Sequence, residues 1–418
     1  MPSPAFWQSI FNRRTLICVF TGFASGMPLY VLFQLLPAFL SKQGVSIKEI
    51  GLFALVTFPY TWKFIWSPLM DRFTPLPLGR RRSWMLLTQL ALLVSIATLG
   101  FLDASRSIGM VAFVAWLVAF FSASQDIVLD AYRRELLPDS ELGWGNSVHV
   151  QAYRISGLVP GALGLILADH LPWQQVFPII AAFMLIGVAM TLFVHEPLAQ
   201  LSAPATLRSA IVEPFREFVS RNNWGMALMI LSFMFLYKLG DSMATALSTP
   251  FYIDLGFSLS EIGVVAKTSA LWASIVGGVL GGLWMIRIGI NRALWLFGIV
   301  QVVTILGFAW LAVAGANLWL LAIVISLEYL GVGLGTAAFT AFIARETSMA
   351  FAATQFALFT ALSALPRTFA NATTGYIVDA IGWTHFYLLC AVLALPGMLL
   401  LIKIAPWPRS VGQMAVER

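Results

Sequence analysis

The stretch GVSIKEIGLF, residues 44–53, has a similar counterpart in GFSLSEIGVV, residues 256–265, with five of ten residues identical. The offset between the two is 212 positions, close to half of the 418-residue chain. A second pair has nearly the same offset, with LADHLPWQQVF at 167–177 and IVDAIGWTHFY at 377–387. Two pairs of similar stretches with nearly equal offsets indicate that the chain consists of two related halves.

The composition around these repeats is that of a membrane protein. Hydrophobic residues make up 59% of the chain and charged residues 11%, whereas soluble domains average about 45–50% and 25%. Soluble, disordered and disulfide-stapled classes are therefore excluded. The net charge of +6 would favour a nucleic-acid partner in a soluble protein. Here the basic residues lie in short loops between apolar runs, which indicates membrane topology and no nucleic-acid partner.

Apolar runs of about 20 residues, the length that crosses a bilayer, predict twelve transmembrane helices. They cover about 15–40, 48–70, 84–102, 108–132, 143–168, 173–194, 224–251, 260–286, 293–314, 317–344, 352–379 and 383–404. Six spans separate the repeated stretches, and because six is even, the two halves have the same orientation. We predict an all-α polytopic membrane protein with two parallel-repeat six-helix bundles.

The longest connection sets the predicted domain boundaries. An N-terminal bundle covers 1–194, a cytoplasmic linker 195–223, a C-terminal bundle 224–404 and a short tail 405–418. Apolar residues recur at helical spacing between 207 and 218, so the linker is either an amphipathic helix on the membrane surface or a plain connection. Seventeen of the 25 Lys and Arg residues fall on one side of this topology and three on the other. This bias predicts that both termini are cytoplasmic.

Ionisable residues also lie within the predicted spans, where each costs about 2.5 kcal/mol or more unless it meets water or a partner. None lies inside spans 3, 6, 9 or 12. The pattern indicates that every third helix faces lipid while the others surround an aqueous cavity. The embedded residues are Lys63, Asp126, Asp130, Arg154, Lys238, Asp241, Lys267, Glu328 and Arg367.

Three of the embedded carboxylates, Asp126, Asp241 and Glu328, are candidates for proton coupling. Asp126 and Asp130 lie four residues apart on one helix face, where two like charges disfavour double ionisation; a structural gate paired with nearby arginines is the alternative. Lys238 and Asp241 share a face and either neutralise each other or act on substrate and proton. Glu328 lies near mid-span, and a hydrogen-bonded neutral carboxyl group is its alternative role.

Cationic and aromatic side chains are the candidates for substrate binding. Arginine makes bidentate contacts to carboxylates, and flat rings can stack on a sugar, although most membrane aromatics serve packing or the interfacial belt. The candidates are Lys63, Gln125, Arg154, Lys238, Lys267, Arg367, Trp62, Tyr153 and Tyr237. The four histidines are scattered, so we expect no metal site.

Several motifs resemble those of a known family. The stretch SPLMDRFTPLPLGRRRSW (67–84) resembles the loop after span 2 in the major facilitator superfamily, where an aspartate and a basic cluster clamp the inner gate. Other motifs resemble the bacterial muropeptide permeases, the AmpG-like family: GFASGMPL (22–29), FSASQDIVLDAY (121–132), LYKLGDSMA (236–244), EIGVVAKT (261–268) and ATQFALFTALSALPR (353–367). By this resemblance the cytoplasmic gate comprises Asp71, Arg72, Arg82, Asp130, Arg133 and Arg134.

The resemblance implies a proton-coupled importer in the bacterial cell inner membrane. Its substrate would be an anionic glycopeptide, GlcNAc–anhydro-MurNAc with or without a stem peptide, taken up by alternating access for peptidoglycan recycling. In that family this flux also feeds β-lactamase induction and so antibiotic resistance. The expected partners are this substrate, protons and the lipid bilayer. We expect a monomer without cofactor, driven by the proton gradient.

The sequence also bears on two alternatives to muropeptide import. Related branches of the family carry ferri-siderophores or acetyl-CoA, so import of another organic anion is the alternative. An enzyme acting on lipid-linked wall precursors would need a nucleophile or a metal set, and the sequence contains neither HExxH nor GxSxG. The sequence therefore predicts a secondary active transporter and not an enzyme.

Overall fold

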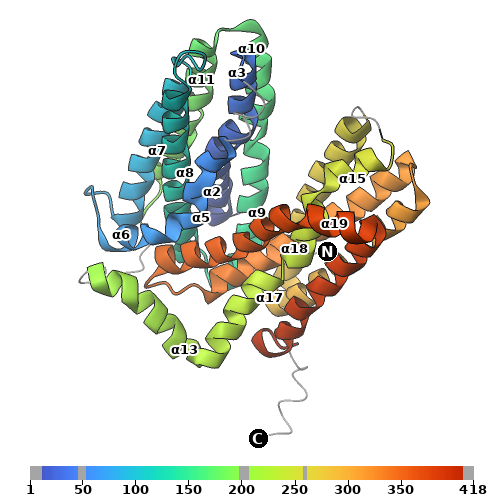
Figure 1. Ribbon diagram of the computed structural model, residues 1–418. Coiled ribbons are helices and arrows are strands. Elements are labelled where there is room, and N and C mark those ends of the chain that lie inside the picture. Colours follow the sequence, from blue (N-terminus) through green and yellow to red (C-terminus); the bar gives the residue numbers. More distant parts are fainter. Residues whose placement is uncertain (1–11, 46–52, 197–206, 258–260, 408–418) are drawn as a thin grey trace, which may run out of the picture. The chain divides into compact units, whose positions relative to one another are not determined.

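The computed structural model describes residues 12–45, 53–196, 207–257 and 261–407 (Figure 1). Every regular element within these ranges is helical, which confirms the all-α fold class. The helices of the first half come first, followed by those of the second.

The first two spans are broken into short pieces. The first span consists of α2 (Arg13–Tyr30), the π-helical turn η1 (Val31–Leu35) and α3 (Leu36–Lys42). The second consists of η2 (Phe53–Thr57), α5 (Phe58–Trp62), η3 (Lys63–Ile65) and α6 (Ser67–Arg72). Pro59 and Pro68 lie in the first turns of α5 and α6, where proline is tolerated because the N–H it lacks has no intrahelical partner. Each proline therefore allows a new helix to begin where the preceding one ends.

The remaining spans of the first half are more regular. Spans three and four are α7 (Arg80–Leu99) and α8 (Ile108–Leu136). The turn η4 (Asp139–Glu141) leads into span five, which comprises α9 (Leu142–Ser156), η5 (Val159–Leu163) and α10 (Gly164–His170). Span six comprises α11 (Trp173–Ala182) and α12 (Met184–Phe193).

The second half contains longer helices that join neighbouring segments across a turn. Its elements are α13 (Leu207–Leu236), α14 (Leu239–Ala246), α15 (Ser248–Asp254), η6 (Ile262–Ala266), α17 (Lys267–Ala314), α18 (Leu318–Glu346) and α19 (Ala352–Ile404). The turn residues are Asn223 in α13, Gly289 in α17 and Gly382 in α19, with φ of 53°, 76° and 74°. Glycine enters this left-handed region without steric cost, so the two glycines mark where one span ends and the next begins.

Nine helices in the described ranges are long and apolar enough to cross a membrane. These nine helices account for ten of the twelve predicted spans, because α17 contains one span on each side of Gly289. Span two is not among the nine, because its helical pieces are too short to be counted. Span 11 contributes the shorter apolar helix Ala352–Ala364, while span 12 lies within Thr373–Ile404. The helices thus follow the predicted path of the chain.

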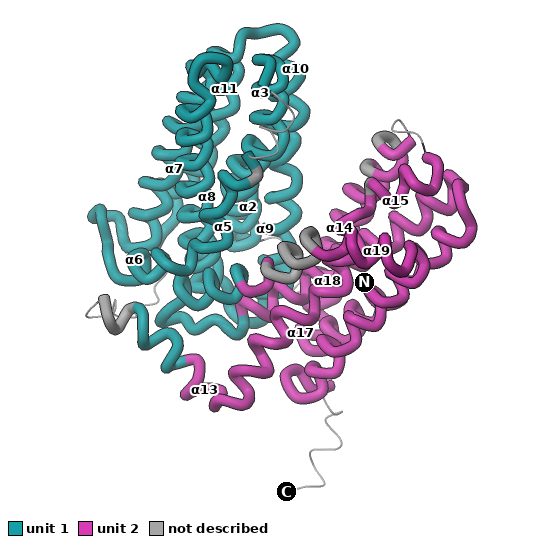
Figure 2. Tube along the Cα trace, in the orientation of Figure 1, with its two compact units in different colours: residues 1–217, 345–361 teal, residues 218–344, 362–418 magenta. Residues whose placement is uncertain are grey.

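Contacts between residues divide the chain into two compact units, coloured separately in Figure 2. The first unit comprises residues 1–217 and 345–361, and the second comprises 218–344 and 362–418. Residues 345–361 include the end of α18 and the start of α19, yet they pack with the first unit. The predicted boundaries at 194 and 224 differ from this division and stay a prediction.

The predicted linker lies partly outside the described residues, since 197–206 are not described. From Leu207 it forms the first part of α13, which is interrupted at Asn223. Ile211, Val212 and Phe215 are exposed on this part. The segment is therefore helical, with Phe218 buried at 5% exposure while the earlier apolar side chains are exposed, and its place on the membrane surface stays a prediction.

Glycines permit very close helix contacts in each unit. A Cβ atom at Gly22 of α2 would lie 2.2 Å from the backbone oxygen of His149 in α9, and one at Gly26 would lie 2.4 Å from that of Tyr153. In the second unit, a Cβ atom at Gly333 would lie 2.3 Å from a backbone oxygen of α17. Small residues let membrane helices approach in this way, which explains the glycines of GFASGMPL in structural terms.

Candidate functional site

The first group of embedded charges, the Asp126 cluster, comprises Ser25, Lys63, Asp126, Asp130 and Arg133. The Ser25 hydroxyl of α2 donates to Asp126 Oδ1 at 2.5 Å. Asp130 Oδ1 lies 2.7 Å from Arg133 Nη2, and Asp130 Oδ2 lies 3.9 Å from Lys63 Nζ. One carboxylate is thus held by two cations and the other by a hydroxyl group. The two aspartates therefore have different environments although they share a face of α8.

Arg133 extends the Asp126 cluster to other elements of the first unit. Its Nε donates to Asn146 Oδ1 of α9 at 2.7 Å, and its guanidinium lies 5.6 Å from the ring centre of Phe356. The adjacent Arg134 donates to the backbone oxygen of Thr347 at 3.2 Å and pairs with Asp139. Both arginines are buried. These contacts connect the end of α8 to residues 345–361, and the gate role of Asp130, Arg133 and Arg134 stays a prediction.

A second group, the Asp71 cluster, comprises Asp71, Arg80, Arg81 and Glu135. Arg81 Nη2 lies 2.8 Å from Asp71 Oδ1 and 2.6 Å from Glu135 Oε1. The backbone oxygen of Asp71 accepts from Arg80 at 3.0 Å. The side chains of Asp71 and Arg81 have no solvent exposure. Two acids and two arginines balance in charge, so the cluster meets the condition for stable burial of charges.

Asp71 also caps the start of α19. Its Oδ2 accepts from the backbone N–H of Thr354 at 2.9 Å and from the Thr354 hydroxyl at 2.8 Å, and its Oδ1 lies 3.4 Å from the nitrogen of Ala353. Helix N-termini favour anions because their first N–H groups have no intrahelical partners. Next to Thr354, Gln355 donates to the backbone oxygen of Pro214 and to Glu217. The segment 345–361 is therefore tied to both α6 and α13.

The other two predicted gate residues have different contacts. Arg82 donates to the backbone oxygens of Thr191 and Leu192 at 3.0 Å each, and so binds the last turn of α12. Arg72 lies with its guanidinium 5.5 Å from the ring centre of Phe73. The structure thus brings together Asp71 with Arg81, a residue that the motif did not single out, while Arg82 joins spans three and six.

The third group, the Asp241 cluster, lies in the second unit and comprises Tyr237, Lys238, Asp241 and Glu328. Lys238 Nζ lies 2.5 Å from Asp241 Oδ2 and 3.5 Å from the Thr336 hydroxyl of α18. Lys238 separates α13 from α14, with φ −102° and ψ 2°. The chain is therefore not a continuous helix at this point, and Asp241 lies in the first turn of α14, where a negative charge is favourable.

Glu328 is the most isolated of the embedded carboxyl groups. It is 1% exposed in the middle of α18. Asp241 and Lys238 act on it electrostatically, and so does the Thr304 side chain. Neither of its carboxyl oxygens meets full hydrogen-bonding geometry with a partner among the described residues. Burial of an incompletely paired carboxylate is costly, so Glu328 stays a candidate for proton coupling.

The predicted substrate residues are distributed over both units. Gln125 donates to the backbone oxygen of Ala24 at 2.7 Å. Tyr153 lies 5.9 Å from the Tyr30 ring, and Arg154 acts electrostatically on Tyr30. Tyr237 stacks on Phe339. Trp62 is 41% exposed and lies beside Phe58 and Phe64. The side chains of Lys267 and Arg367 lie outside the described part of the chain.

Several partners were missed by sequence reasoning. Ser25, Asn146 and Thr336 hold charged groups that were predicted, but they lie on other helices. Ser25 is part of the motif GFASGMPL, which indicates the family and not the partner of the serine. Glu135 could have been suspected because it is the acid nearest the arginine pair 133–134. Thr354 follows a Ser-containing loop at a helix start, which is a capping signal, but its acceptor is 283 positions away.

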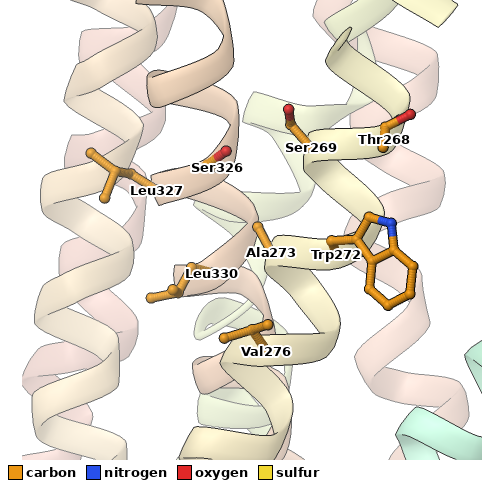
Figure 3. Close-up of a pocket in the computed structure, with 8 residues that line it drawn as sticks. All are labelled: Thr268, Ser269, Trp272, Ala273, Val276, Ser326, Leu327 and Leu330. Carbon is orange, nitrogen blue, oxygen red and sulfur yellow. The ribbon is translucent and has the colours of Figure 1, made fainter. Parts of the chain in front are cut away.

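A large groove lies apart from these clusters, between α17 and α18. Its volume is about 440 Å³, and Figure 3 shows Trp272 and Ala273 on α17 opposite Ser326 and Leu330 on α18. Hydroxyl groups of Thr268, Ser269 and Ser326 gather toward one end of it. None of the predicted charged candidates lines the groove. In the described ranges, no group of three or more His, Cys, Asp or Glu residues could hold a metal ion.

A family model described as Major Facilitator Superfamily matches residues 18–371. The chain belongs to the major facilitator superfamily. It is 12% identical to the transporter FucP, whose crystal structure in the outward conformation matches with a TM-score of 0.71 over 94% of this chain and 99% of that one. This likeness confirms the predicted transporter fold.

Sequence relatives place the chain more closely. It is 43% identical over 391 residues to the anhydromuropeptide permease of Escherichia coli, covering 93% of this chain and 79% of the relative. It is 52% identical over 410 residues to an uncharacterised protein of Haemophilus influenzae, covering 96% of both. The predicted membership in the muropeptide permease family is therefore confirmed. The protein is a multi-pass membrane transporter and not an enzyme.

Proposed function

We propose that this transporter imports anhydro-muropeptides across the bacterial inner membrane by alternating access, coupled to protons, for peptidoglycan recycling. The observation that carries the proposal is the 43% identity, over 93% of the chain, to the E. coli anhydromuropeptide permease. The embedded charges support it chemically. A muropeptide is anionic, and each unit holds a lysine next to an aspartate at an embedded position.

The Asp241 cluster supports a coupling mechanism. Lys238 is held by Asp241, so a substrate carboxylate that binds Lys238 withdraws the cation from Asp241. The carboxylate then lies buried near Glu328 without its counter-ion, and uptake of a proton from water relieves that cost. Release of substrate restores the ion pair and expels the proton. In the first unit, Lys63 acts electrostatically on Asp126, so a substrate that binds Lys63 would remove a cation from that carboxyl group, while Arg133 keeps Asp130 paired.

Arg154 is proposed as a further contact to the substrate. It lies on α9 beside Tyr153 and acts on Tyr30, so a carboxylate of the peptide stem would meet one cation and two aromatic rings. We expect Arg154→Ala to raise KM for uptake with little change in kcat. An unchanged KM would mean that Arg154 holds helices together and does not bind substrate.

Uptake of radiolabelled anhydro-muropeptide by a recycling-deficient strain tests the proposal. We expect accumulation that requires expression of the transporter and that stops when an uncoupler collapses the pH gradient. Absence of uptake by correctly inserted protein would reject the muropeptide as substrate. The same assay with a ferri-siderophore or acetyl-CoA then identifies the alternative.

Variants separate proton coupling from substrate choice. Asp126→Asn and Asp241→Asn should abolish accumulation while the protein still inserts in the membrane. Asp103→Asn is the matched control, because Asp103 is 48% exposed and pairs with Arg106 away from the clusters. Counterflow of substrate in proteoliposomes, which needs no net proton movement, should persist in both variants. Normal accumulation by either variant under a pH gradient would remove that residue from the proton path.

The orientation is also proposed. The excess of basic residues on one side of the predicted topology supports a cytoplasmic position for both termini. Alkaline phosphatase fused after Lys403 should be inactive, whereas a green fluorescent protein fused there should fluoresce. The opposite result would invert the topology and with it the direction of import.

A further inference from the structure

A small cavity in the second unit adjoins the Asp241 cluster. Its volume is about 10 Å³, and Tyr237, Asp241, Gln301 and Met398 are among the residues that line it. A site of about 10–15 Å³ holds one water molecule when polar groups surround it. The cavity is therefore of the right size for a single water, and its polar lining decides whether one is bound.

Two polar atoms of the lining residues have no hydrogen-bond partner among the described residues. They are Asp241 Oδ1, an acceptor, and Gln301 Nε2, a donor. Asp241 is 6% exposed and Gln301 is 5% exposed. Buried polar groups are nearly always paired with protein or with ordered water. One water between these two atoms would accept from the amide and donate to the carboxylate, and would satisfy both.

Two glycines leave the space beside the cavity that the Gln301 amide and the Met398 thioether occupy. A Cβ atom at Gly335 of α18 would lie 2.2 Å from Gln301 Oε1 and 2.7 Å from Nε2. Thus the amide occupies space that only a glycine leaves open. At Gly298, a Cβ atom would lie 2.1 Å from the sulfur of Met398, so the thioether is confined to the same cavity. The amide donor and the sulfur are therefore both held against the site.

We propose that Gln301 holds a structural water on Asp241 and is thereby a positioning residue for the carboxylate that carries the proton. This inference rests on the proposed proton coupling, which it deepens. Other charged and titratable groups also face Asp241: Tyr237 and Lys238 from the break between α13 and α14, and Glu328 from α18. The bound water serves the oxygen of Asp241 that Lys238 leaves free, and it keeps the ionised carboxylate hydrated within the bundle.

X-ray radiolytic labelling with mass spectrometry tests for the water directly, without substrate. Radiolysis of a bound water oxidises the adjacent side chain, and methionine sulfur is readily oxidised. We expect Met398, which is 8% exposed, to be labelled at least about tenfold faster than Met190, which is 7% exposed in the first unit. In Gln301→Leu, the rate at Met398 should fall to that of Met190. Equal rates at both methionines in the unchanged protein would overturn the water site, whether or not muropeptides are the substrate.

The pH profile of uptake tests the positioning role. Loss of the water in Gln301→Leu disfavours the ionised form of Asp241, so the midpoint of the profile should move upward by about one pH unit, a tenfold change in proton affinity. Gln301→Asn keeps an amide and should restore most of the original midpoint. A rate that falls equally at every pH, with an unchanged midpoint in Gln301→Leu, would show that Gln301 only packs and would overturn the inference.

Discussion

Replacing Asp71 with asparagine should release the start of α19. In the structure, Asp71 Oδ1 faces the Arg81 guanidinium at 2.8 Å, and Oδ2 faces the N–H and the hydroxyl of Thr354 at 2.9 and 2.8 Å. Donors therefore approach the carboxylate from both sides. Asparagine has the same shape but only one acceptor oxygen, so its NH₂ group must face a donor on one side.

The size of the effect follows from these contacts. Removing one partner of a buried ion pair costs about 3–5 kcal/mol, and a hydrogen bond to a charged group contributes about 1.5–3 kcal/mol. Whichever side asparagine loses, the cost is at least about 2–3 kcal/mol. The remaining oxygen should stay with the cationic Arg81 guanidinium, because hydrogen bonds to a charged donor are stronger, so the loss falls on α19. The backbone amides of Ala353 and Thr354 should then exchange with deuterium about 30- to 150-fold faster, since each 1.4 kcal/mol is a factor of ten.

Hydrogen–deuterium exchange with mass spectrometry on the peptide around 352–360 measures this rate. Asp103→Asn should leave it unchanged. Thr354→Ala should accelerate exchange by itself, and combined with Asp71→Asn it should add little, because contacting residues are not additive. Exchange in Asp71→Asn within twofold of the unchanged protein, or full additivity of the two substitutions, would refute the assignment of Asp71 as the cap of α19.

Three further substitutions probe other contacts. Gly79→Ala should lower the Tm, because Gly79 has φ 97° and a Cβ atom there would lie 2.6 Å from the carboxylate of Glu196, which caps α7; such backbone strain costs about 1–3 kcal/mol, and an unchanged Tm would contradict this. Ser25→Ala removes a hydrogen bond to a buried carboxyl group, worth about 1.5 kcal/mol or more if ionised, so proton-driven uptake should slow about tenfold while counterflow continues; equal loss of both would argue against a role in coupling. Gly333→Ala should destabilise the protein by about 1–3 kcal/mol through overpacking, whereas Gly375→Ala should not, because a Cβ atom there meets nothing within 4 Å. Similar melting curves for the two variants would show that the close helix contact at Gly333 does not stabilise the protein.

Hydropathy predicted most of the fold because a bilayer leaves few alternatives to the helix. It could not predict how span two breaks into four short pieces. That break depends on which carbonyl oxygens neighbouring helices and side chains satisfy once Pro59 and Pro68 interrupt the helix. Nor could it predict that residues 345–361 pack with the first unit, because that depends on long-range contacts such as the one between Asp71 and Thr354.

The candidate site was predictable where partners lie on one helix. The spacing of three residues alone paired Lys238 with Asp241. The pairing of Asp130 with Arg133 follows from the same helical period, and so does the shared face of Asp126 and Asp130 on α8. Partners on distant helices carry no such signal. Ser25 reaches Asp126 from 101 positions away, and although it lies in the motif GFASGMPL, nothing in that motif names the carboxyl group that it contacts.

The attachment of residues 345–361 to the first unit has a consequence for how the protein could be divided. If the chain were cut within 197–206 and its two parts expressed as separate polypeptides, the later part would still carry a segment that inserts beside α6 and α8. The two fragments would then be held together by non-covalent contacts, namely the Asp71 cap on α19, the hydrogen bond from Arg134 to Thr347 and the contact of Arg133 with the Phe356 ring. Two such fragments should copurify, and fragments in which Asp71 is asparagine should separate more readily.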